Sequence, residues 1–308
     1  MRIKEFLKRF LPTPAKTFNE RMQAIETQLL IMNTDNNQEF YNSYKQMRRP
    51  KFINYDAISI STKKFSKELE KNGVEVRDYI IDKDEYESYL KNSSYDNYYN
   101  DYADVTYSEK TLEHFVASQL LELQRDDIYI DIASSCSPAP EIYSKLFGVK
   151  CFRQDLSFPK GINGNCIGGD AANMPVPNGF ANKMALHCSF EHFEGDADVR
   201  FIKEVARVLK PNGMCCILPL YTSNYYCITT DPVVAINENV EFEEGVLLNC
   251  VEKWGNRYGR RYDVRRFLER VYKQIGEDIK LEVFNVNGAK EISSVNYLES
   301  ALLLSKVG

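Results

Sequence analysis

The stretch IYIDIASSCSP, residues 128–138, decides the fold that this sequence predicts. An apolar run containing Asp131 is followed by small side chains and then by a helical pattern that ends before Gly148. This order predicts a buried strand, a tight turn and a helix capped by glycine. Ser137 before Pro138 suits the N-cap and the first position of that helix, whose free N–H groups would face an anionic group.

Two further acids follow at positions that a nucleoside ligand would use. Residues 149–153 predict a second strand that ends at Asp155, and a carboxylate there can accept hydrogen bonds from ribose hydroxyls. The stretch GGDAANMP, residues 168–175, places Asp170 in a later loop. A nicotinamide dinucleotide is disfavoured, because its pyrophosphate needs a close approach to glycines and this first turn has Ser, Cys and Pro instead.

With these motifs the sequence resembles the type 11 group of class I S-adenosylmethionine (SAM) methyltransferases. The resemblance implies SAM as the cofactor, with Asp131 as the acid of the first motif and Asp155, followed by Leu156, at the ribose. It also implies that Asp170 accepts a hydrogen bond from the adenine amine and that Ala171 lies against the adenine ring.

The first motif departs from the family pattern, which has three glycines after the acid. Ala133, Ser135 and Ser137 stand in their places, so we expect the turn to bind the cofactor while using ordinary backbone angles. The stretch EVARVLKPNG, residues 204–213, resembles the family's helix and turn before the fifth strand. Asn212 replaces a glycine there, and asparagine tolerates the left-handed region.

The predicted fold class is α/β: a Rossmann-like class I methyltransferase sheet with flanking helices, plus an N-terminal helical extension. An apolar content of 44% supports a folded core. We expect amphipathic and heptad helices in residues 1–34, a polar, tyrosine-rich accessory or lid region in 35–109 and the SAM-dependent methyltransferase domain in 110–308. Strand-like residues 279–286 and 297–304 would complete the sheet.

Methyl transfer from a sulfonium is an in-line displacement, so the protein aligns the acceptor and, for a hydroxyl, removes its proton. His192 is the first candidate for the general base and Glu191 is the alternative, although in relatives the matching pair often shapes the cofactor pocket. His187, after the fourth strand, is expected in the wall of that pocket. His114 lies on the preceding helix and either packs there or reaches the same cleft.

Aromatic and cationic residues follow the fifth strand. Tyr221, Arg257 and Arg261 are predicted to bind the acceptor, because guanidinium groups suit an anionic or highly hydroxylated molecule. Asp196 and Asp198, with Glu194, would suit a divalent metal, but acids at the start of a helix commonly complement its dipole. No metal is therefore predicted.

The remaining features concern partners and compartment. Residues 1–11 predict a basic amphipathic helix that contacts the inner membrane face or docks on its own domain. Residues 18–32 have heptad spacing, which predicts a homodimer seam or internal packing. A net charge of −5 disfavours nucleic acid. Eight cysteines without a C-x-x-C pair, and no apolar run of about 18 residues, predict a cytoplasmic protein.

The N-terminal helices followed by this core resemble bacterial enzymes of cell-surface polysaccharide biosynthesis. That resemblance implies a sugar O-methyltransferase with a small-molecule or glycan acceptor. The alternative is a catalytically silent SAM-fold scaffold in a glycan-assembly complex, which the glycine-free first motif would permit.

Overall fold

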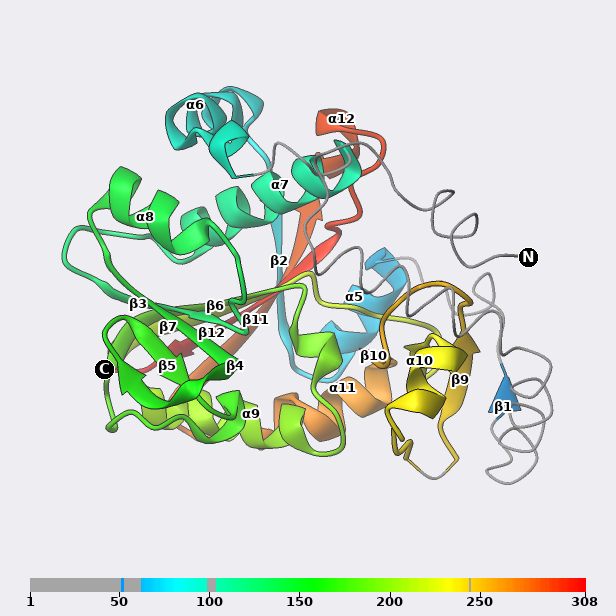
Figure 1. Cartoon of the computed structure of the whole chain (residues 1–308). Helices are drawn as coiled ribbons and strands as arrows, with labels where there is room; N and C mark the ends of the chain where they lie inside the picture. The colour runs from blue at the N-terminus through cyan, green and yellow to red at the C-terminus, as the bar shows by residue number, and fades with distance from the viewer. Residues whose placement is uncertain (1–50, 53–61, 99–103, 244) are drawn as a thin grey trace, which may run out of the picture.

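The structure is a computed structural model, and it describes residues 51–52, 62–98, 104–243 and 245–308 (Figure 1). The helices predicted within residues 1–34 lie outside these ranges, so the membrane contact of residues 1–11 and the dimer seam of residues 18–32 stay predictions. None of the helices in the described ranges is long and apolar enough to cross a membrane.

Within the described residues the main sheet has eight strands in the order β2-β11-β12-β7-β6-β3-β4-β5. These strands are Glu75–Ile80 (β2), Ile128–Ile132 (β3), Lys150–Asn163 (β4), Cys166–Gly168 (β5), Ala181–His187 (β6), Leu209–Leu218 (β7), Ile279–Asn287 (β11) and Ser300–Lys306 (β12). Strands β4, β3, β6 and β7 are parallel neighbours, whereas β12 runs antiparallel to both β7 and β11. This arrangement confirms the predicted Rossmann-like α/β class.

Helices cover both faces of this sheet. In Figure 1, α6, α7, α8 and α12 lie on one side, and α5, α9 and α11 lie on the other. The α-helices are Thr62–Lys71 (α5), Lys83–Ser93 (α6), Asp104–Leu120 (α7), Ala139–Phe147 (α8), Ala197–Val208 (α9), Pro232–Asn237 (α10), Val264–Arg270 (α11) and Ala289–Ile292 (α12). Short 3₁₀ turns span Tyr95–Asn97, Ala171–Asn173, Phe190–His192 and Tyr272–Gln274.

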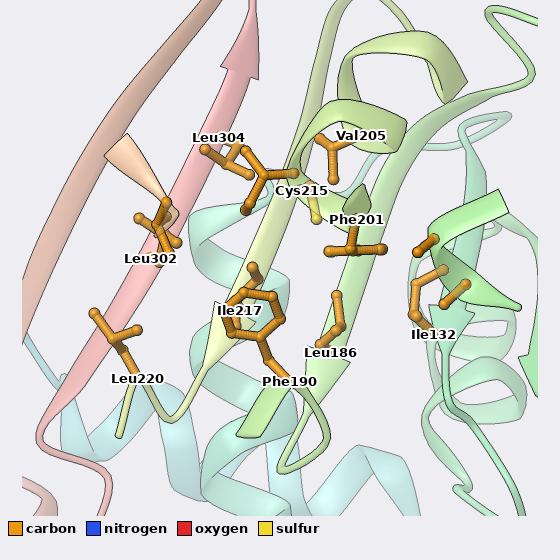
Figure 2. Close-up of a cluster of buried hydrophobic side chains, with 14 of the residues drawn as sticks. Ile132, Leu186, Phe190, Phe201, Val205, Cys215, Ile217, Leu220, Leu302 and Leu304 are labelled. Carbon is orange, nitrogen blue, oxygen red and sulfur yellow. The ribbon is translucent and has the colours of Figure 1, made fainter. Parts of the chain in front are cut away.

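Alternation along the strands feeds two apolar cores, one on each face. In β7, for example, Cys215 and Ile217 join the core under α9, and Cys216 and Leu218 join the core under α7 and α8. Figure 2 shows the first core, where Phe201 from α9 lies over the sheet. Because side chains of a strand alternate between faces, a strand covered on both sides must be apolar throughout.

Local predictions agree with the structure at two turns, but Pro138 rather than Ser137 is the N-cap of α8, the last strand begins at Ser300 rather than 297, and the second strand differs at its end. Asn212 is left-handed, with φ 62°, as expected, and Gly148 caps α8 with φ 70°. The second strand does not end at Asp155 but continues to Asn163. Gly168 makes room for this continuation, because a Cβ there would lie 2.0 Å from the carbonyl oxygen of Pro159.

The region expected to be an accessory or lid contributes directly to the main sheet. Strand β2 pairs in parallel with β11, and α5 packs against both of these strands. Helix α7 runs across residue 110, where the methyltransferase domain was expected to begin. In the described residues, the 35–109 region is thus continuous with the sheet.

A second, smaller sheet has the order β1-β9-β8-β10 and lies beside the main one in Figure 1. Its strands are Lys51–Phe52 (β1), Cys227–Thr230 (β8), Leu247–Cys250 (β9) and Gly259–Arg261 (β10). Strands β8, β9 and β10 are inserted between β7 and β11 in the sequence, whereas β1 precedes β2, and α11 returns the chain to the main sheet.

Buried charges attach this small sheet to α9. Asp198 is fully buried and pairs with Arg260 of β10 at 3.0 Å and Arg270 of α11 at 2.6 Å. Its carboxylate also accepts a hydrogen bond from Tyr262 at 2.7 Å. Asp198 therefore does more than complement a helix dipole. No group of three or more side chains that could hold a metal ion occurs among the residues that the structure describes.

We predict that Asp198→Asn lowers the free energy of unfolding by about 3 kcal/mol, because it removes the fully buried carboxylate that pairs with Arg260 and Arg270 and leaves them with the more exposed Glu243. Urea denaturation at neutral pH measures this change. The matched control is Asp196→Asn, since Asp196 pairs with Arg200 at an exposed position. That substitution should change stability by less than about 0.5 kcal/mol. Equal effects of the two substitutions would contradict a stabilising role for the buried ion pairs of Asp198.

Candidate functional site

The order of the sheet reverses between β3 and β6, since β3 pairs with β4 on one side and with β6 on the other. Open α/β sheets bind ligands in the crevice at the carboxyl ends of the strands at such a switch point. A cavity of about 280 Å³ lies at this position. We call it the switch-point cavity, and its lining includes residues 131–137, Lys110, His114, His187 and Cys188.

The turn after β3 keeps a glycine-like backbone without glycine. Ala133 has φ 51° and Ser135 has φ 42°, so the expectation of ordinary backbone angles was wrong. Cys188, across the cavity after β6, also has a positive φ, at 48°. Each such residue costs of order 1 kcal/mol, and strain of this kind is retained where the surrounding structure imposes it.

Three consecutive residues of β4 impose this conformation. Arg153 donates to the carbonyl oxygen of Ser137 at 2.6 Å, and Gln154 Oε1 accepts from the N–H of Ala133 at 3.2 Å. Asp155 Oδ2 accepts from the N–H of Ser135 at 2.9 Å. Gln154 is buried and was not singled out in the sequence, because glutamine in a strand carries no signal of its own.

Opposite charges border the cavity at two of its walls. Asp131 is buried and accepts hydrogen bonds from Ser134 at 2.7 Å and Tyr129 at 3.0 Å. Burial raises the pKa of Asp131, while these hydroxyl groups act to lower it. Lys110 of α7 contributes an ammonium group, which pairs with the buried Glu113 at 2.9 Å. The cavity thus offers both a carboxylate and a cation to a zwitterionic ligand.

The other predicted cofactor residues lie along the neighbouring loops. Asp155 Oδ1 accepts hydrogen bonds from the N–H and the hydroxyl of Ser157, at 2.9 and 2.7 Å. Leu156 beside it is 77% exposed. Asp170 caps the turn that begins at the buried Ala171 and pairs with Arg200 at 2.9 Å. Asp155 therefore supports the turn after β3 directly, and the exposed side chain of Leu156 lies next to it in the chain.

His187, expected in the wall of the cofactor pocket, lines the switch-point cavity, and its side chain is only 5% exposed. Its Nε2 lies 3.4 Å from the hydroxyl of Tyr129 and 3.8 Å from Asp131 Oδ1. Burial lowers the pKa of His187 to about 3, and the charge of Lys110 acts in the same direction, so the ring is neutral at physiological pH. His114 packs edge-on against it, with ring centroids 4.6 Å apart, and is bound to Tyr95 at 2.8 Å.

A larger cavity of about 460 Å³ lies between the main sheet and the small sheet. Aromatic side chains, carboxylates, hydroxyls and a guanidinium line it, so we call it the aromatic cavity. The lining includes Glu191, Tyr221, Trp254, Arg261, Tyr297 and Glu299. Tyr221 follows β7 and Tyr297 precedes β12, which places both at the same edge of the main sheet as the switch-point cavity.

The two cavities meet at Cys188. This residue lines the switch-point cavity, and its Sγ lies 3.6 Å from the hydroxyls of Tyr221 and Tyr297, which line the aromatic cavity. The thiol of Cys188 donates to Glu113 at 2.9 Å. These three side chains therefore form a boundary that the two cavities share.

Glu191 and His192 adopt different positions relative to the aromatic cavity. Glu191 lines it, and its Oε2 is buried with no hydrogen-bond partner in the described part of the chain. Burial raises the pKa of Glu191, an effect that His192 opposes. His192 Nδ1 donates to the carbonyl oxygen of Tyr258 at 2.5 Å, so in a neutral ring Nε2 is the nitrogen that carries no hydrogen. This Nε2 lies 3.6 Å from Glu191 Oε1.

The three predicted acceptor residues separate into two groups. Tyr221 and Arg261 line the aromatic cavity, and the Arg261 guanidinium lies 5.0 Å from the centre of the Tyr221 ring. Arg257 is instead paired with Glu194 at 2.6 Å and Glu238 at 2.8 Å, and it is not among the residues that line this cavity in the described ranges. Trp254 and Tyr297 were missed because each comes from a loop without a motif.

Comparison with known families assigns part of the chain. Residues 148–217 match the family described as "Methyltransferase domain". No curated protein matches the chain. The matched residues run from the start of β4 to the end of β7, so they include β6 on one side of the switch point but not β3 on the other.

Solved structures show similarity of the fold. A Burkholderia thailandensis 1,6-didemethyltoxoflavin-N1-methyltransferase with bound S-adenosylhomocysteine is 12% identical, with 74% of this chain and 92% of that chain covered and a TM-score of 0.45. A methyltransferase from an antibiotic biosynthesis pathway of Anabaena variabilis is 15% identical, with 36% and 45% covered and a TM-score of 0.31. A Galdieria sulphuraria protein described as a sarcosine dimethylglycine methyltransferase is 19% identical, with 37% and 46% covered and a TM-score of 0.30. This chain thus spans less than half the length of the last two.

The Rossmann-like sheet and the family match make S-adenosylmethionine the cofactor of this domain. The switch-point cavity fits its amino-acid end, because Asp131 can hold the ammonium group and Lys110 the carboxylate. Leu156, exposed beside Asp155, offers an apolar surface for the adenosine end. The small side chains of the turn leave space for a ligand close to the backbone.

We predict that Ala133→Gly and Ser135→Gly each raise the free energy of unfolding by about 0.5 kcal/mol or more, because glycine adopts positive φ without strain. Chemical denaturation of the single variants measures the change. Ser137→Gly is the matched control, since Ser137 lacks a positive φ and its hydroxyl accepts from the N–H of Ala139 at 3.3 Å. That variant should be less stable than the unsubstituted protein. Destabilisation by all three changes would show that the turn has ordinary angles in solution.

Glu109, on α7, gives the wall of the aromatic cavity a pH dependence. Its Oε2 accepts from the backbone N–H of Tyr297 at 2.9 Å, and burial, reinforced by the charge of Glu113, raises the pKa of Glu109 to about 8. The folded protein therefore binds this proton more tightly than the unfolded chain does. Its contribution to stability is complete below the ordinary value of 4.5 and is lost as the pH rises to about 8.

We predict that Glu109→Gln becomes progressively more stable than the unsubstituted protein between pH 5 and pH 8, because the amide has no proton to lose. Thermal denaturation at several pH values within this interval measures the difference. Glu87→Gln, on the exposed surface of α6, controls for loss of a carboxylate. A constant difference between Glu109→Gln and the unsubstituted protein across the interval would contradict the prediction.

Proposed function

We propose that this protein is a SAM-dependent methyltransferase that methylates a hydroxyl group of a sugar or glycan precursor, of the kind used in cell-surface polysaccharide biosynthesis. The observation that carries the proposal is the meeting of two cavities at Cys188. One cavity fits the cofactor, and the other offers a set of polar and aromatic groups to an acceptor. A catalytically silent scaffold would not need a second cavity at this position.

The lining of the aromatic cavity supports a polyhydroxylated acceptor. Thr229, Glu299 and Arg261 present a hydroxyl, a carboxylate and a guanidinium to the same space. A sugar has several hydroxyl groups that both donate and accept hydrogen bonds, so it can satisfy groups of all three kinds.

The reaction needs alignment and one proton acceptor. The bound cofactor supplies an electrophilic methyl group. Tyr221 and Tyr297, at the junction, orient the acceptor oxygen toward the switch-point cavity. Glu191 Oε2 accepts the hydroxyl proton, and His192, held by the carbonyl oxygen of Tyr258, positions the Glu191 carboxylate in its doubly protonated form, in which Nε2 also carries a hydrogen. Glu191 is thus the catalytic base, and His192 is a positioning residue.

We predict that Glu191→Gln lowers kcat by about 100-fold or more, the usual contribution of a general base, while SAM binds as before. Transfer of a radiolabelled methyl group to UDP-hexoses measures kcat, and calorimetric titration with SAM and S-adenosylhomocysteine measures binding. In the unsubstituted protein kcat should fall on acidification. Its inflection should lie above the ordinary glutamate pKa of 4.5, because burial raises the pKa of Glu191.

Controls separate the base from the cofactor site. Glu269→Gln, on the far helix α11, should leave kcat unchanged. Lys110→Met and Asp131→Asn should instead weaken the calorimetric binding of S-adenosylhomocysteine. If neither adenosyl compound binds to the unsubstituted protein, the enzyme proposal fails and the scaffold alternative replaces it.

The N-terminal region belongs to the same proposal. We infer cytoplasmic action, because all eight cysteines are free thiols. Residues 1–11 would contact the inner membrane face and residues 18–32 would form a homodimer. A chain that lacks residues 1–34 should bind S-adenosylhomocysteine but sediment as a monomer. A truncated chain that stays dimeric would contradict this role of the heptad helix.

A further inference from the structure

Trp254 and Gly259 form an unusual contact in the wall of the aromatic cavity. A Cβ on Gly259 would lie 2.6 Å from Cη2 and 3.5 Å from Cζ3 of Trp254, so the six-membered ring of the indole lies directly against the Gly259 backbone. Gly259 does not have a positive φ. The turn conformation therefore does not explain a glycine at this position, whereas the space taken by the indole does.

The surrounding structure holds Trp254 in place. Gly259 begins β10 and pairs with Thr229 of β8, which fixes the surface on which the ring lies. The loop that carries Trp254 is attached to Asp231, whose Oδ2 accepts from the N–H of Gly255 at 3.0 Å. Asp231 is buried and also caps α10 through the N–H of Val233. The indole is thus half-buried and pre-organised before any ligand binds.

We propose that Trp254 is the platform on which the ring of the acceptor lies, and that Gly259 is the residue that seats this platform. This inference rests on the proposed function and adds the substrate class: a hexopyranose unit. A pyranose has a face of C–H groups, which packs on an indole, and a rim of hydroxyls. Glu191, Thr229 and Glu299 lie in the same cavity to receive that rim.

The geometry also relates the platform to the catalytic base. The ring of His192 lies 6.2 Å from the Trp254 ring, at an interplanar angle of 34°. His192 positions Glu191, so a sugar that covers Trp254 has a hydroxyl within the part of the cavity that Glu191 lines. The platform would therefore select which hydroxyl of the ring is methylated.

Trp254 is the one tryptophan in the sequence, so its fluorescence reports on the cavity directly. The experiment titrates the full chain, saturated with S-adenosylhomocysteine, with UDP-glucose, UDP-galactose and UDP-N-acetylglucosamine, and follows tryptophan emission excited at about 295 nm, a wavelength that favours indole over phenol. Tyramine, a phenol with an amine, is the competing probe. We expect a saturable change in emission with at least one of the UDP-sugars and none with tyramine.

Two variants test the roles of Gly259, which seats the indole, and Trp254, the platform itself. Gly259→Ala should displace the indole, shift the emission of the free protein and weaken sugar binding about tenfold or more. Gly276→Ala is the matched control, because Gly276 also lacks a positive φ and a Cβ there would meet only the side chain of Asp278. Trp254→Ala, measured by calorimetry, covers the case in which Gly259→Ala does not fold. It should lose sugar binding to the same extent and bind S-adenosylhomocysteine within about twofold, since the cofactor lies in the other cavity.

The binding experiments distinguish failure of the sugar platform from failure of the proposed function. If S-adenosylhomocysteine does not bind at all, both the function and this inference are overturned. If it binds but no UDP-sugar changes the emission, or if tyramine alone does, the sugar platform is wrong while the methyltransferase remains. Sugar binding that survives Trp254→Ala would also overturn the platform. A selective loss of sugar binding in both variants supports it.

Discussion

The hydrogen bonds between β4 and the turn after β3 are the constraint on which the rest of the site depends. Arg153, Gln154 and Asp155 each bind a different residue of the turn. Gln154 also donates to the carbonyl oxygen of Gly169 at 2.6 Å, so the same side chain connects the turn to the loop that contains Asp170. Each bond contributes about 1 kcal/mol, which together can offset the strain at Ala133 and Ser135. The glycines of the family pattern are thereby replaced by contacts from the neighbouring strand.

Much of the fold could be predicted from the sequence, because it depends on local patterns. The apolar runs of β3, β6 and β7 are buried on both faces, and the left-handed Asn212 follows from the chemistry of its own side chain. The backbone of Ala133 and Ser135 could not be predicted in this way. Alanine and serine avoid positive φ when isolated, and only the β4 contacts, made by residues some twenty positions later, reverse that preference.

The residues of the candidate site also differ in whether local sequence or tertiary contacts determine their positions. Asp131 lies in a predicted strand and the Glu191–His192 pair follows another, so their approximate positions were accessible from the sequence. The prediction for Arg261 agrees with its place in the lining of the aromatic cavity, but Arg257 has the same chemistry and is held by two carboxylates. Trp254 had no signal at all in the sequence. Its role depends on the space above Gly259, which exists only once β10 has paired with β8.

The small sheet needs a rigid attachment if one of its loops carries an acceptor platform. Apolar contacts alone permit sliding between packed layers, whereas a buried ion pair has one low-energy geometry. The fully buried pair of Asp198 and Arg260 joins α9, which packs on the main sheet, to β10, which seats Trp254. Arg260 further donates to the carbonyl oxygens of Phe193 and Gly195, just after Glu191 and His192 in the chain. The buried charges therefore fix the separation between Glu191 on one side of the aromatic cavity and Trp254 on the other, which the proposed transfer to a single hydroxyl requires.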